Sequence, residues 1–332
     1  MTDSQHSPDT IGVIVGRDLV GDALIKLPFL RALRRAFPKA LIHWITAQGP
    51  TAYAGPLREA TRDLIDDIHE QPAWLPFSDA IPGPPSPAFD ILIDTRNRWR
   101  EARQARTMTH KVFIAPALRF LLSDRRPPLF QRKPPHLCDQ LLRLVELAAG
   151  YRPPSTGALI VAPELKARAR LILPEGRSYV GLAPGAGNPV KIWPRYKFEK
   201  VAMLQAAKGR VPVFILGPQE LDWYDELVAT IPAAKFPLQD YAGWDTDQLT
   251  IAHTLAIAGL LSAAVANDSG VGHMLAAMDC PLVTLFGPTS PDKLAPRVTR
   301  GRIIKAHDYG DTQMKAIPTE AVDKAVDELL AP

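Results

Sequence analysis

Residues 11–46 read IGVIVGRDLVGDALIKLPFLRALRRAFPKALIHWIT. The first five form a short apolar run that is typical of a buried strand, and a second such run occupies 41–46. Between them, leucines recur at helical spacing through 23–37. A strand, a helix and another strand in this order predict two parallel strands joined by a right-handed crossover. The stretch therefore predicts an α/β fold built on a parallel sheet.

The same alternation continues along the chain, stops at a linker and begins again. Apolar runs predict further strands at 66–69, 89–94, 179–183, 211–216, 263–266 and 281–286. Helical spacing predicts helices at 136–149, 196–208, 221–231, 248–262, 271–278 and 319–330. Between the two halves, residues 151–157 are rich in Pro, Ser and Gly, which is the composition of an interdomain linker.

These segments predict two Rossmann-like, doubly wound domains, 1–157 and 158–332, that face each other across a central cleft. Ligands of such sheets bind at the carboxyl ends of the strands, so we expect the site in that cleft. The last helix, 319–330, is assigned to the second domain, with a return onto the first domain as the alternative.

Composition indicates a globular protein with one unusual charged segment. Of the 332 residues, 46% are apolar and 22% are charged, and the net charge is +4. Residues 96–133 hold eleven Lys and Arg against two acidic residues, so this window carries +9 and the rest of the chain −5. The window predicts attraction to nucleic acid, phosphorylated sugars or an anionic membrane, with a solvated surface as the alternative. It has few stacking aromatics beyond Trp99 and Phe113, which argues against nucleic acid.

Several other classes of protein are excluded by what the sequence lacks. Cys138 and Cys280 lie far apart, and neither they nor the histidines have metal-ligand spacing, so we expect no disulfide framework and no metal. The first ten residues, MTDSQHSPDT, are too polar for a signal peptide. No apolar run approaches the ~18–20 residues of a membrane span. We therefore expect a cytoplasmic protein.

The loop 16–22, GRDLVGD, follows the first strand. It lacks the G-x-G-x-x-G spacing of dinucleotide-binding turns. It does place Asp22 at the start of a helix and at the end of a central strand. The carboxylate is then either a helix cap that accepts hydrogen bonds from backbone amides, or a general base. The residues themselves leave both interpretations open.

Two loops of the second half have features of anion-binding sites. In 184–194, PGAGNPVKIWP, small residues permit close approach of a phosphate and Lys191 supplies positive charge, although a plain turn with a solvated lysine is equally consistent. In 267–273, NDSGVGH, a strand ends and a helix begins, and the first amides of a helix attract anions. His273, one turn inside that helix, either reaches a phosphate or has a structural role.

Together these motifs resemble glycosyltransferase family 9, the heptosyltransferases of lipopolysaccharide core assembly. The resemblance begins with Gly21-Asp22 and the LPFLRALR text of 27–34. It continues with Pro184-Gly185-Ala186 and KIWP at 191–194, with NDSGVGHMLAA at 267–277, and with LFGPT at 285–289. The motifs stand in the family's order and span nearly the whole chain.

The resemblance implies a GT-B fold, in which the N-terminal domain binds the acceptor and the C-terminal domain binds the nucleotide sugar. It implies inverting transfer without a metal or other cofactor, the ADP-sugar being a substrate. Asp22 would act as the base, while Lys191 and the amides of Ser269 and Gly270 would stabilise the leaving diphosphate. The other donor-binding residues that it implies are Ala186, Gly187, Glu220, Leu249, Asp268 and His273.

The reaction implied is transfer of a heptose from ADP-heptose to the lipopolysaccharide core, a lipid-linked anionic oligosaccharide. The enzyme would be cytoplasmic, in peripheral contact with the inner face of the inner membrane, and Arg17, Arg96, Arg98 and Arg100 would bind the acceptor. The alternatives are another nucleotide sugar, a protein or capsule acceptor, or a non-catalytic nucleotide-sugar-binding protein. Ala186-Gly187-Asn188 has fewer hydroxyls than many family members have there, which leaves the identity of the sugar open.

Overall fold

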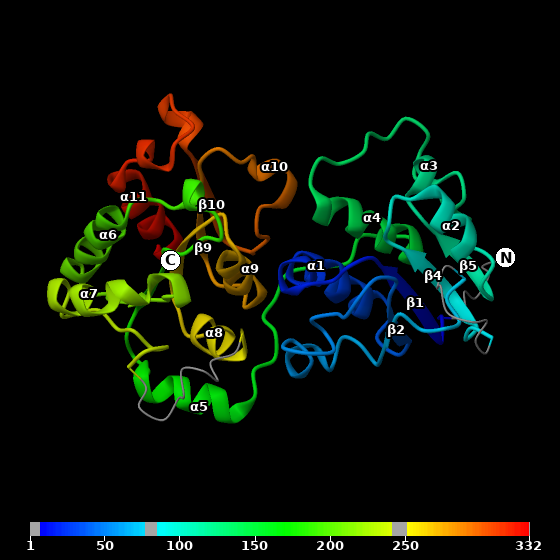
Figure 1. Ribbon diagram of the computed structural model, residues 1–332, viewed down its shortest axis with the longest axis horizontal. Helices are drawn as coiled ribbons and strands as arrows, with labels where there is room; N and C mark the ends of the chain where they lie inside the picture. Colours follow the sequence, from blue (N-terminus) through cyan, green and yellow to red (C-terminus); the bar gives the residue numbers. More distant parts are fainter. Residues whose placement is uncertain (1–6, 77–84, 241–250, 332) are drawn as a thin grey trace. The chain divides into compact units, whose positions relative to one another are not determined.

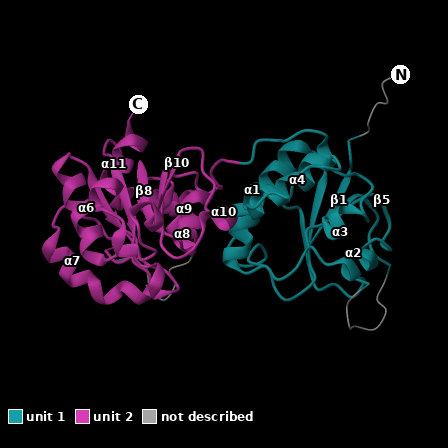
Figure 2. Ribbon diagram, turned by 90° about the horizontal axis from the view of Figure 1, so that it is seen from above, with its two compact units in different colours: residues 1–155 teal, residues 156–332 magenta. Residues whose placement is uncertain are grey.

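The computed structural model describes residues 7–76, 85–240 and 251–331 (Figure 1). The chain divides into two compact units, Met1–Ser155 and Thr156–Pro332 (Figure 2). The division falls within the Pro-, Ser- and Gly-rich segment 151–157. Each unit has its own five-stranded parallel sheet and its own hydrophobic core.

The sheet of the first unit has the strand order β3-β2-β1-β4-β5, and every neighbouring pair is parallel. The order reverses between β1 and β4, which is the switch point where ligands of such sheets bind. The strands are β1 Thr10–Val15, β2 Leu41–Thr46, β3 Asp67–Glu70, β4 Phe89–Asp94 and β5 His110–Ile114.

Helices cover both faces of this sheet. The long helices α1 and α4 pack together on the face of Trp44, whose ring lies 6.3 Å from that of Phe29. The opposite face carries α2, whose Ala102 and Ala105 pack in the core with Ile45. The helical segments are α1 Val20–Ala36, η1 Glu59–Thr61, α2 Trp99–Ala105, α3 Ala117–Phe120 and α4 Leu137–Ala149.

The sheet of the second unit has the strand order β10-β9-β8-β6-β7 and is also parallel throughout. Here the order reverses between β6 and β8, so the loops after these two strands stand at the switch point. The strands are β6 Tyr179–Ala183, β7 Val211–Phe214, β8 Ala263–Asn267, β9 Leu282–Phe286 and β10 Gly301–Lys305.

Two hydrophobic clusters, one on each face, enclose the second sheet. One face is covered by α6, α7 and α11, and the other by α5, α8 and α9. The main helices are α5 Pro163–Ile172, α6 Arg195–Ala207, α7 Tyr224–Thr230, α8 Ile251–Ala258, α9 Gly270–Ala277 and α11 Thr319–Leu330. Shorter helical turns are η2 Pro189–Lys191, η3 Pro218–Trp223, α10 Pro291–Leu294, η5 Ala306–Tyr309 and η6 Met314–Ala316.

The prediction of two α/β domains with parallel sheets is confirmed. The elements that were not predicted include α2, β5, α5 and β10. The first two lie in the arginine-rich window, where charge obscures the apolar pattern, and three of the five residues of the edge strand β10 are exposed. Among the helices of the described residues, none has the combined length and apolar character needed to cross a bilayer.

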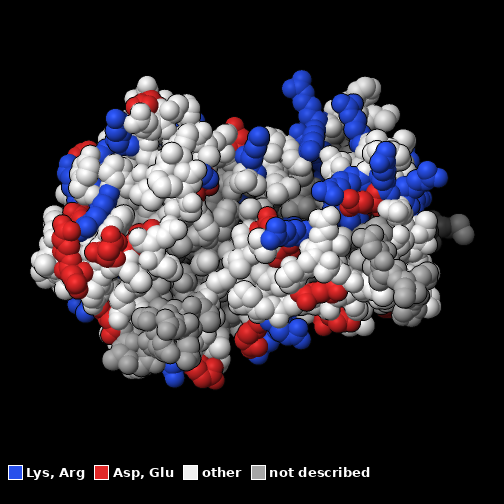
Figure 3. Space-filling model, in the orientation of Figure 1, with Lys and Arg blue, Asp and Glu red and all other residues white. Residues whose placement is uncertain are grey.

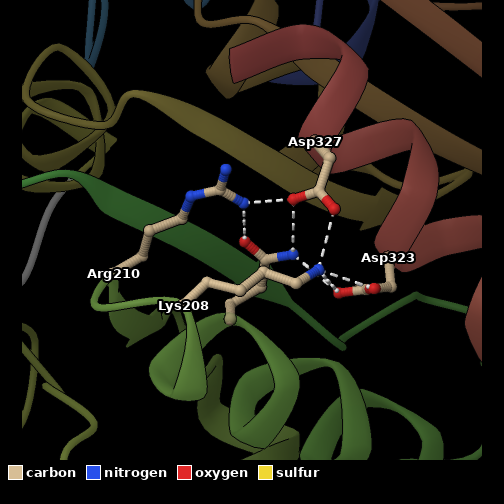
Figure 4. Close-up of polar contacts among 5 residues, drawn as sticks. Lys208, Arg210, Asp323 and Asp327 are labelled. Carbon is tan, nitrogen blue, oxygen red and sulfur yellow. Dashed lines mark hydrogen bonds and ion pairs between the residues drawn. The ribbon is translucent and has the colours of Figure 1, made fainter. Parts of the chain in front are cut away.

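The last helix, α11, packs in the core of the second unit. Its buried residues Val322, Val326 and Leu329 belong to the core of the second sheet. Its polar face is held by a network of charges, shown in Figure 4, that joins it to the end of α6. Lys208 Nζ lies 2.7 Å from Asp323 and 2.8 Å from Asp327.

The network also holds two further groups. Arg210 forms an ion pair with Asp327, and the fully buried Gln205 donates a hydrogen bond of 2.7 Å to Asp323. Partial burial alone would raise the pKa of Asp327, but hydrogen bonds from Lys208 and Arg210 outweigh it and hold that pKa below its ordinary value. Several charges therefore share one ordered geometry, which lowers the entropic cost of each contact.

We expect Asp327→Asn to lower the free energy of unfolding by about 1 kcal/mol at pH 7, since it removes one carboxylate from a partly exposed network. The native pKa of Asp327 is depressed, so its contribution is complete above the unfolded pKa and is lost as pH falls through the native one. Urea denaturation of both proteins from neutral to acidic pH measures this difference.

The control is Asp308→Asn, which breaks an isolated exposed pair with Lys305 at 3.3 Å. It should cost less than ~0.5 kcal/mol. A loss for Asp327→Asn no larger than the control's, or one that persists at acidic pH, would contradict a stabilising role for the network.

Candidate functional site

Three loops of the second unit bring polar side chains together at the carboxyl edge of its sheet. Lys191 comes from the loop after β6, Asp268 follows β8 and Thr289 follows β9. Lys191 Nζ lies 2.7 Å from Asp268 Oδ2, and the Thr289 hydroxyl donates to the same oxygen at 2.8 Å. The side chains of Lys191 and Asp268 are 28% and 14% exposed, so the pair is accessible without being fully solvated. We call these three residues the sheet-edge cluster.

Asn267, the last residue of β8, fixes the loop that carries Lys191. Its side-chain amide donates a hydrogen bond of 2.6 Å to Pro184 O and accepts one of 3.2 Å from Trp193 N. Trp193 is fully buried and its indole donates to Ile317 O at 3.1 Å. Both ends of the loop are thus tied to one buried amide, and a turn at Asn188 directs the chain between them.

The start of α9 lies directly after Asp268 in the chain. Ser269 is the N-cap residue, but its side chain caps no amide. Its Oγ is buried and has no hydrogen-bond partner within the described residues. Because the first amides of a helix have no partner inside it, this terminus can bind an anion next to the sheet-edge cluster. His273, one turn further along, is buried.

Glu220 supports the loop from the side of β7. The carboxylate is buried and accepts a hydrogen bond of 3.1 Å from Gly217 N. Burial raises the pKa of this carboxyl. A Cβ at Gly185 would lie 2.7 Å from Glu220 Oε2, so only glycine permits this close approach.

The other residues predicted to bind the donor differ in how deeply they are buried. Ala186, which follows Gly185, is buried, whereas Gly187 and Gly270 are exposed. Leu249 lies outside the described residues. The structure thus joins Lys191 to Asp268 by direct contact, and Ser269 and Gly270 follow Asp268 directly in the chain.

In the first unit, a buried carboxylate organises the loop between β1 and α1. Asp18 is fully buried and pairs with Lys26 at 2.7 Å. Its other oxygen accepts hydrogen bonds from Trp44 Nε1 at 2.9 Å and Thr51 Oγ1 at 2.7 Å. This arrangement fixes the point at which α1 begins, and with it the position of Asp22.

Asp22 is exposed in the first turn of α1. The N-cap is Leu19, and within the described part of the chain the Asp22 carboxylate accepts no hydrogen bond and forms no ion pair. The interpretation of Asp22 as a helix cap is therefore wrong. Its carboxylate is available to a ligand at the carboxyl edge of the first sheet.

The arginines predicted to bind an acceptor differ in their availability. Arg96 is nearly buried and contacts both oxygens of Asp94, at 2.8 and 2.9 Å. Arg98 is exposed and pairs with Glu101 at 2.8 Å. Arg17 is exposed, and the exposed Arg100 lies over the Trp99 ring at 5.4 Å.

The basic window forms a surface of the first unit that also exposes apolar side chains. Figure 3 shows Lys and Arg gathered around α2 and α3. In the loop after α3, Leu129 and Phe130 are 95% and 97% exposed. They stand between two basic pairs in sequence, Arg125-Arg126 and Arg132-Lys133. We call residues 125–133 the basic-apolar loop.

Sequence reasoning missed three residues that position the two candidate sites, namely Asp18, Asn267 and Thr289. Asn267 and Thr289 belong to motifs that the sequence analysis quotes. Their positions at or just after the ends of predicted strands could have marked them as residues of the site. Asp18 had no such signal, because its partners Trp44 and Thr51 lie far along the chain.

Comparison with known proteins identifies the relatives of this chain. Residues 86–321 match the sequence model of glycosyltransferase family 9 (heptosyltransferase). Lipopolysaccharide heptosyltransferase 2 of Salmonella typhimurium is 29% identical over 130 residues, which are 39% of this chain and 36% of that protein. The matched segment thus spans little more than a third of this curated relative.

The solved structures that share the fold include a family 9 protein and a heptosyltransferase. A glycosyl transferase family 9 protein from Veillonella parvula has a TM-score of 0.70 at 19% identity, with 97% of each chain covered. The heptosyltransferase WaaC of E. coli, solved with ADP, has a TM-score of 0.67 at 16% identity, covering 96% of this chain and 99% of that one. At these identities the likeness shows the fold alone.

Proposed function

Because the chain belongs to glycosyltransferase family 9, the heptosyltransferases, we propose that it transfers a heptose from ADP-heptose to a lipopolysaccharide core acceptor. The observation that carries the proposal is the sheet-edge cluster next to the open start of α9. The second unit binds the donor and the first unit binds the acceptor. The reaction takes place in the cytoplasm, with inversion at the anomeric carbon and without a metal ion.

On the donor side, the diphosphate of the nucleotide sugar lies at the first amides of α9 and beside Lys191. As the bond between the anomeric carbon and the diphosphate breaks, negative charge grows on the leaving oxygen. A fixed donor aimed at such charge contributes ~3–4 kcal/mol to transition-state stabilisation. Lys191 and the helix start supply positive charge of this kind, which supports transfer without a metal. Asp268 accepts hydrogen bonds from hydroxyls of the sugar.

On the acceptor side, Asp22 removes the proton from the attacking hydroxyl. The hydroxyl oxygen bonds to the anomeric carbon on the side opposite the departing ADP, which inverts the configuration. Glycosyl transfer passes through an oxocarbenium-like transition state, so a carboxylate is a sufficient base. The exposure of Asp22 and its lack of a described partner support this role.

We expect Asp22→Asn to reduce kcat by about 10²–10⁴-fold, as loss of a general base does. ADP affinity should not change, because Asp22 belongs to the unit proposed for the acceptor. Steady-state kinetics with ADP-heptose and a heptose-acceptor lipid, together with ADP titration, measure both quantities. The control is Asp63→Asn, an exposed aspartate of the same unit, which should keep wild-type kcat. Asp22→Asn with kcat within a few-fold of wild type would remove Asp22 from the mechanism.

The acceptor is a lipid, and the basic-apolar loop fits contact with an anionic membrane surface. Interfacial binding combines burial of apolar side chains with attraction of Lys and Arg to anionic headgroups. Leu129 and Phe130 supply the apolar side chains, and the Lys and Arg residues beside them in the loop supply the positive charge. This contact brings the first unit to the surface that holds its acceptor.

We expect the double variant Leu129→Ser with Phe130→Ser to bind anionic vesicles at least about tenfold more weakly. Full burial of one such side chain contributes ~1.5–3 kcal/mol, and 1.4 kcal/mol is tenfold. Vesicle co-sedimentation at two salt concentrations measures it. Leu171→Ser, at a site 72% exposed on α5, is the control and should bind as wild type does. Equal binding of the double variant and wild type would exclude the loop from the membrane contact.

A further inference from the structure

Two neighbouring strands at one edge of the first sheet place three potential metal ligands side by side. His43 lies on β2, while Asp67 and His69 lie on the edge strand β3. In the parallel ladder, His43 pairs with Asp67 and Ile45 pairs with His69. Side chains two residues apart on a strand share a face, so all three project from the same side of the sheet.

The ligand atoms of these residues converge. His43 Nδ1 lies 3.1 Å from His69 Nε2 and 3.7 Å from Asp67 Oδ2, and His69 Nε2 lies 3.3 Å from the same oxygen. Tetrahedral Zn²⁺ has bonds of ~2.0–2.1 Å to His and Asp, which places neighbouring ligand atoms ~3.3 Å apart. The three observed separations bracket that value.

A hydrogen bond between the two imidazoles accounts for one of these three separations and not for the other two. Such a bond joins two nitrogens and needs no third group. Here both nitrogens face one carboxylate oxygen as well, and the contacts of 3.3 and 3.7 Å to that oxygen are long for hydrogen bonds. One cation at the centre of the triangle satisfies all three atoms.

We propose that His43 Nδ1, His69 Nε2 and Asp67 Oδ2 bind one Zn²⁺ ion, with water completing its coordination. Of the described residues, these form the one His, Cys, Asp and Glu group with metal-site geometry. Imidazole and carboxylate ligands together suit Zn²⁺. Sequence spacing did not indicate this site, because its ligands come from two strands and meet only through their register.

Aromatic neighbours orient the two imidazole rings, and one ligand of the proposed ion is open to solvent. The His43 ring packs edge-on against Phe89, with 5.5 Å between the ring centroids, and the His69 ring packs against Trp74, with 5.4 Å between the centroids. The histidine side chains are only 16% and 20% exposed, whereas that of Asp67 is 56% exposed. Fixed aromatic neighbours orient the rings, and the exposed carboxylate gives access from solvent.

The site joins the edge strand to the sheet and takes no part in the proposed transfer. Trp44, the next residue after His43, faces α1, so His43 faces the opposite side of the sheet from the helix that carries Asp22. Strand β3 has four residues and stands at the edge of the sheet, next to β2. An ion bound to both strands would therefore join the short edge strand to its neighbour in the sheet.

The test is Zn²⁺ binding by the full chain after removal of metal with a chelator. Competition with a chromophoric chelator should show one equivalent of tightly bound Zn²⁺. His43→Gln, Asp67→Asn and His69→Gln should each weaken binding at least tenfold, since even residues behind the ligands account for about 10–100-fold. Zn²⁺ should also raise the Tm of the wild type by more than it raises that of His69→Gln.

His110→Gln, a histidine of the same unit on β5, is the matched control and should bind Zn²⁺ as the wild type does. Co²⁺ should give visible d–d bands without a thiolate charge-transfer band, because both cysteines are buried elsewhere. The metal-free variants should melt as the metal-free wild type does. Absence of Zn²⁺ binding by the wild type, or binding that none of the three ligand variants weakens, would overturn the proposal. Neither result bears on the transfer reaction.

Discussion

The side-chain amide of Asn267 connects the end of β8 to both ends of the loop 184–193, and the placement of Lys191 depends on it. An amide can donate to Pro184 O and accept from Trp193 N at once, which a carboxylate or an apolar side chain cannot do. Because the group is fully buried, either bond left unmade would carry a full desolvation penalty. With the loop held in this way, Lys191 reaches Asp268, and the sheet-edge cluster forms beside the start of α9.

The first unit uses a buried charge for the same purpose. Asp18 tolerates full burial because Lys26, Trp44 and Thr51 satisfy its two oxygens. Those contacts determine where α1 begins, and the Asp22 carboxylate in its first turn has no partner among the residues that the structure describes. In both units a buried polar residue with complete hydrogen bonding positions an accessible charged residue at the carboxyl edge of a parallel sheet. We infer that this is how the fold keeps these two charged side chains in place without burying them.

The sequence predicted most of the helices and strands that show a hydrophobic periodicity. It missed the side-chain contacts that depend on strand register or that join residues far apart in the chain. The pattern of 11–46 is confirmed as β1, α1 and β2, and the rule that strand ends carry ligands pointed to the loops of Lys191 and Asp268. Strand β5 was missed because the charged residues around it obscure its short apolar run.

Asp22 looked like a helix cap because a helix start can be located from sequence only to within a few residues. The proximity of His43 to His69 follows from the register of β2 and β3, which no spacing along the chain reveals. The catalytic and binding roles of the site residues stay predictions.

We propose that the second unit holds the diphosphate of an ADP-sugar at Lys191 and the start of α9. Calorimetric titration of the chain with ADP, GDP and UDP, in the presence of a chelator, tests it most directly. Lys191→Met is the test variant, and Lys293→Met, at an exposed position of α10, is the control. We expect selective binding of ADP without metal, at least tenfold weaker in Lys191→Met and unchanged in Lys293→Met. Binding of ADP that Lys191→Met leaves intact, or preference for GDP or UDP, would contradict this placement of the diphosphate.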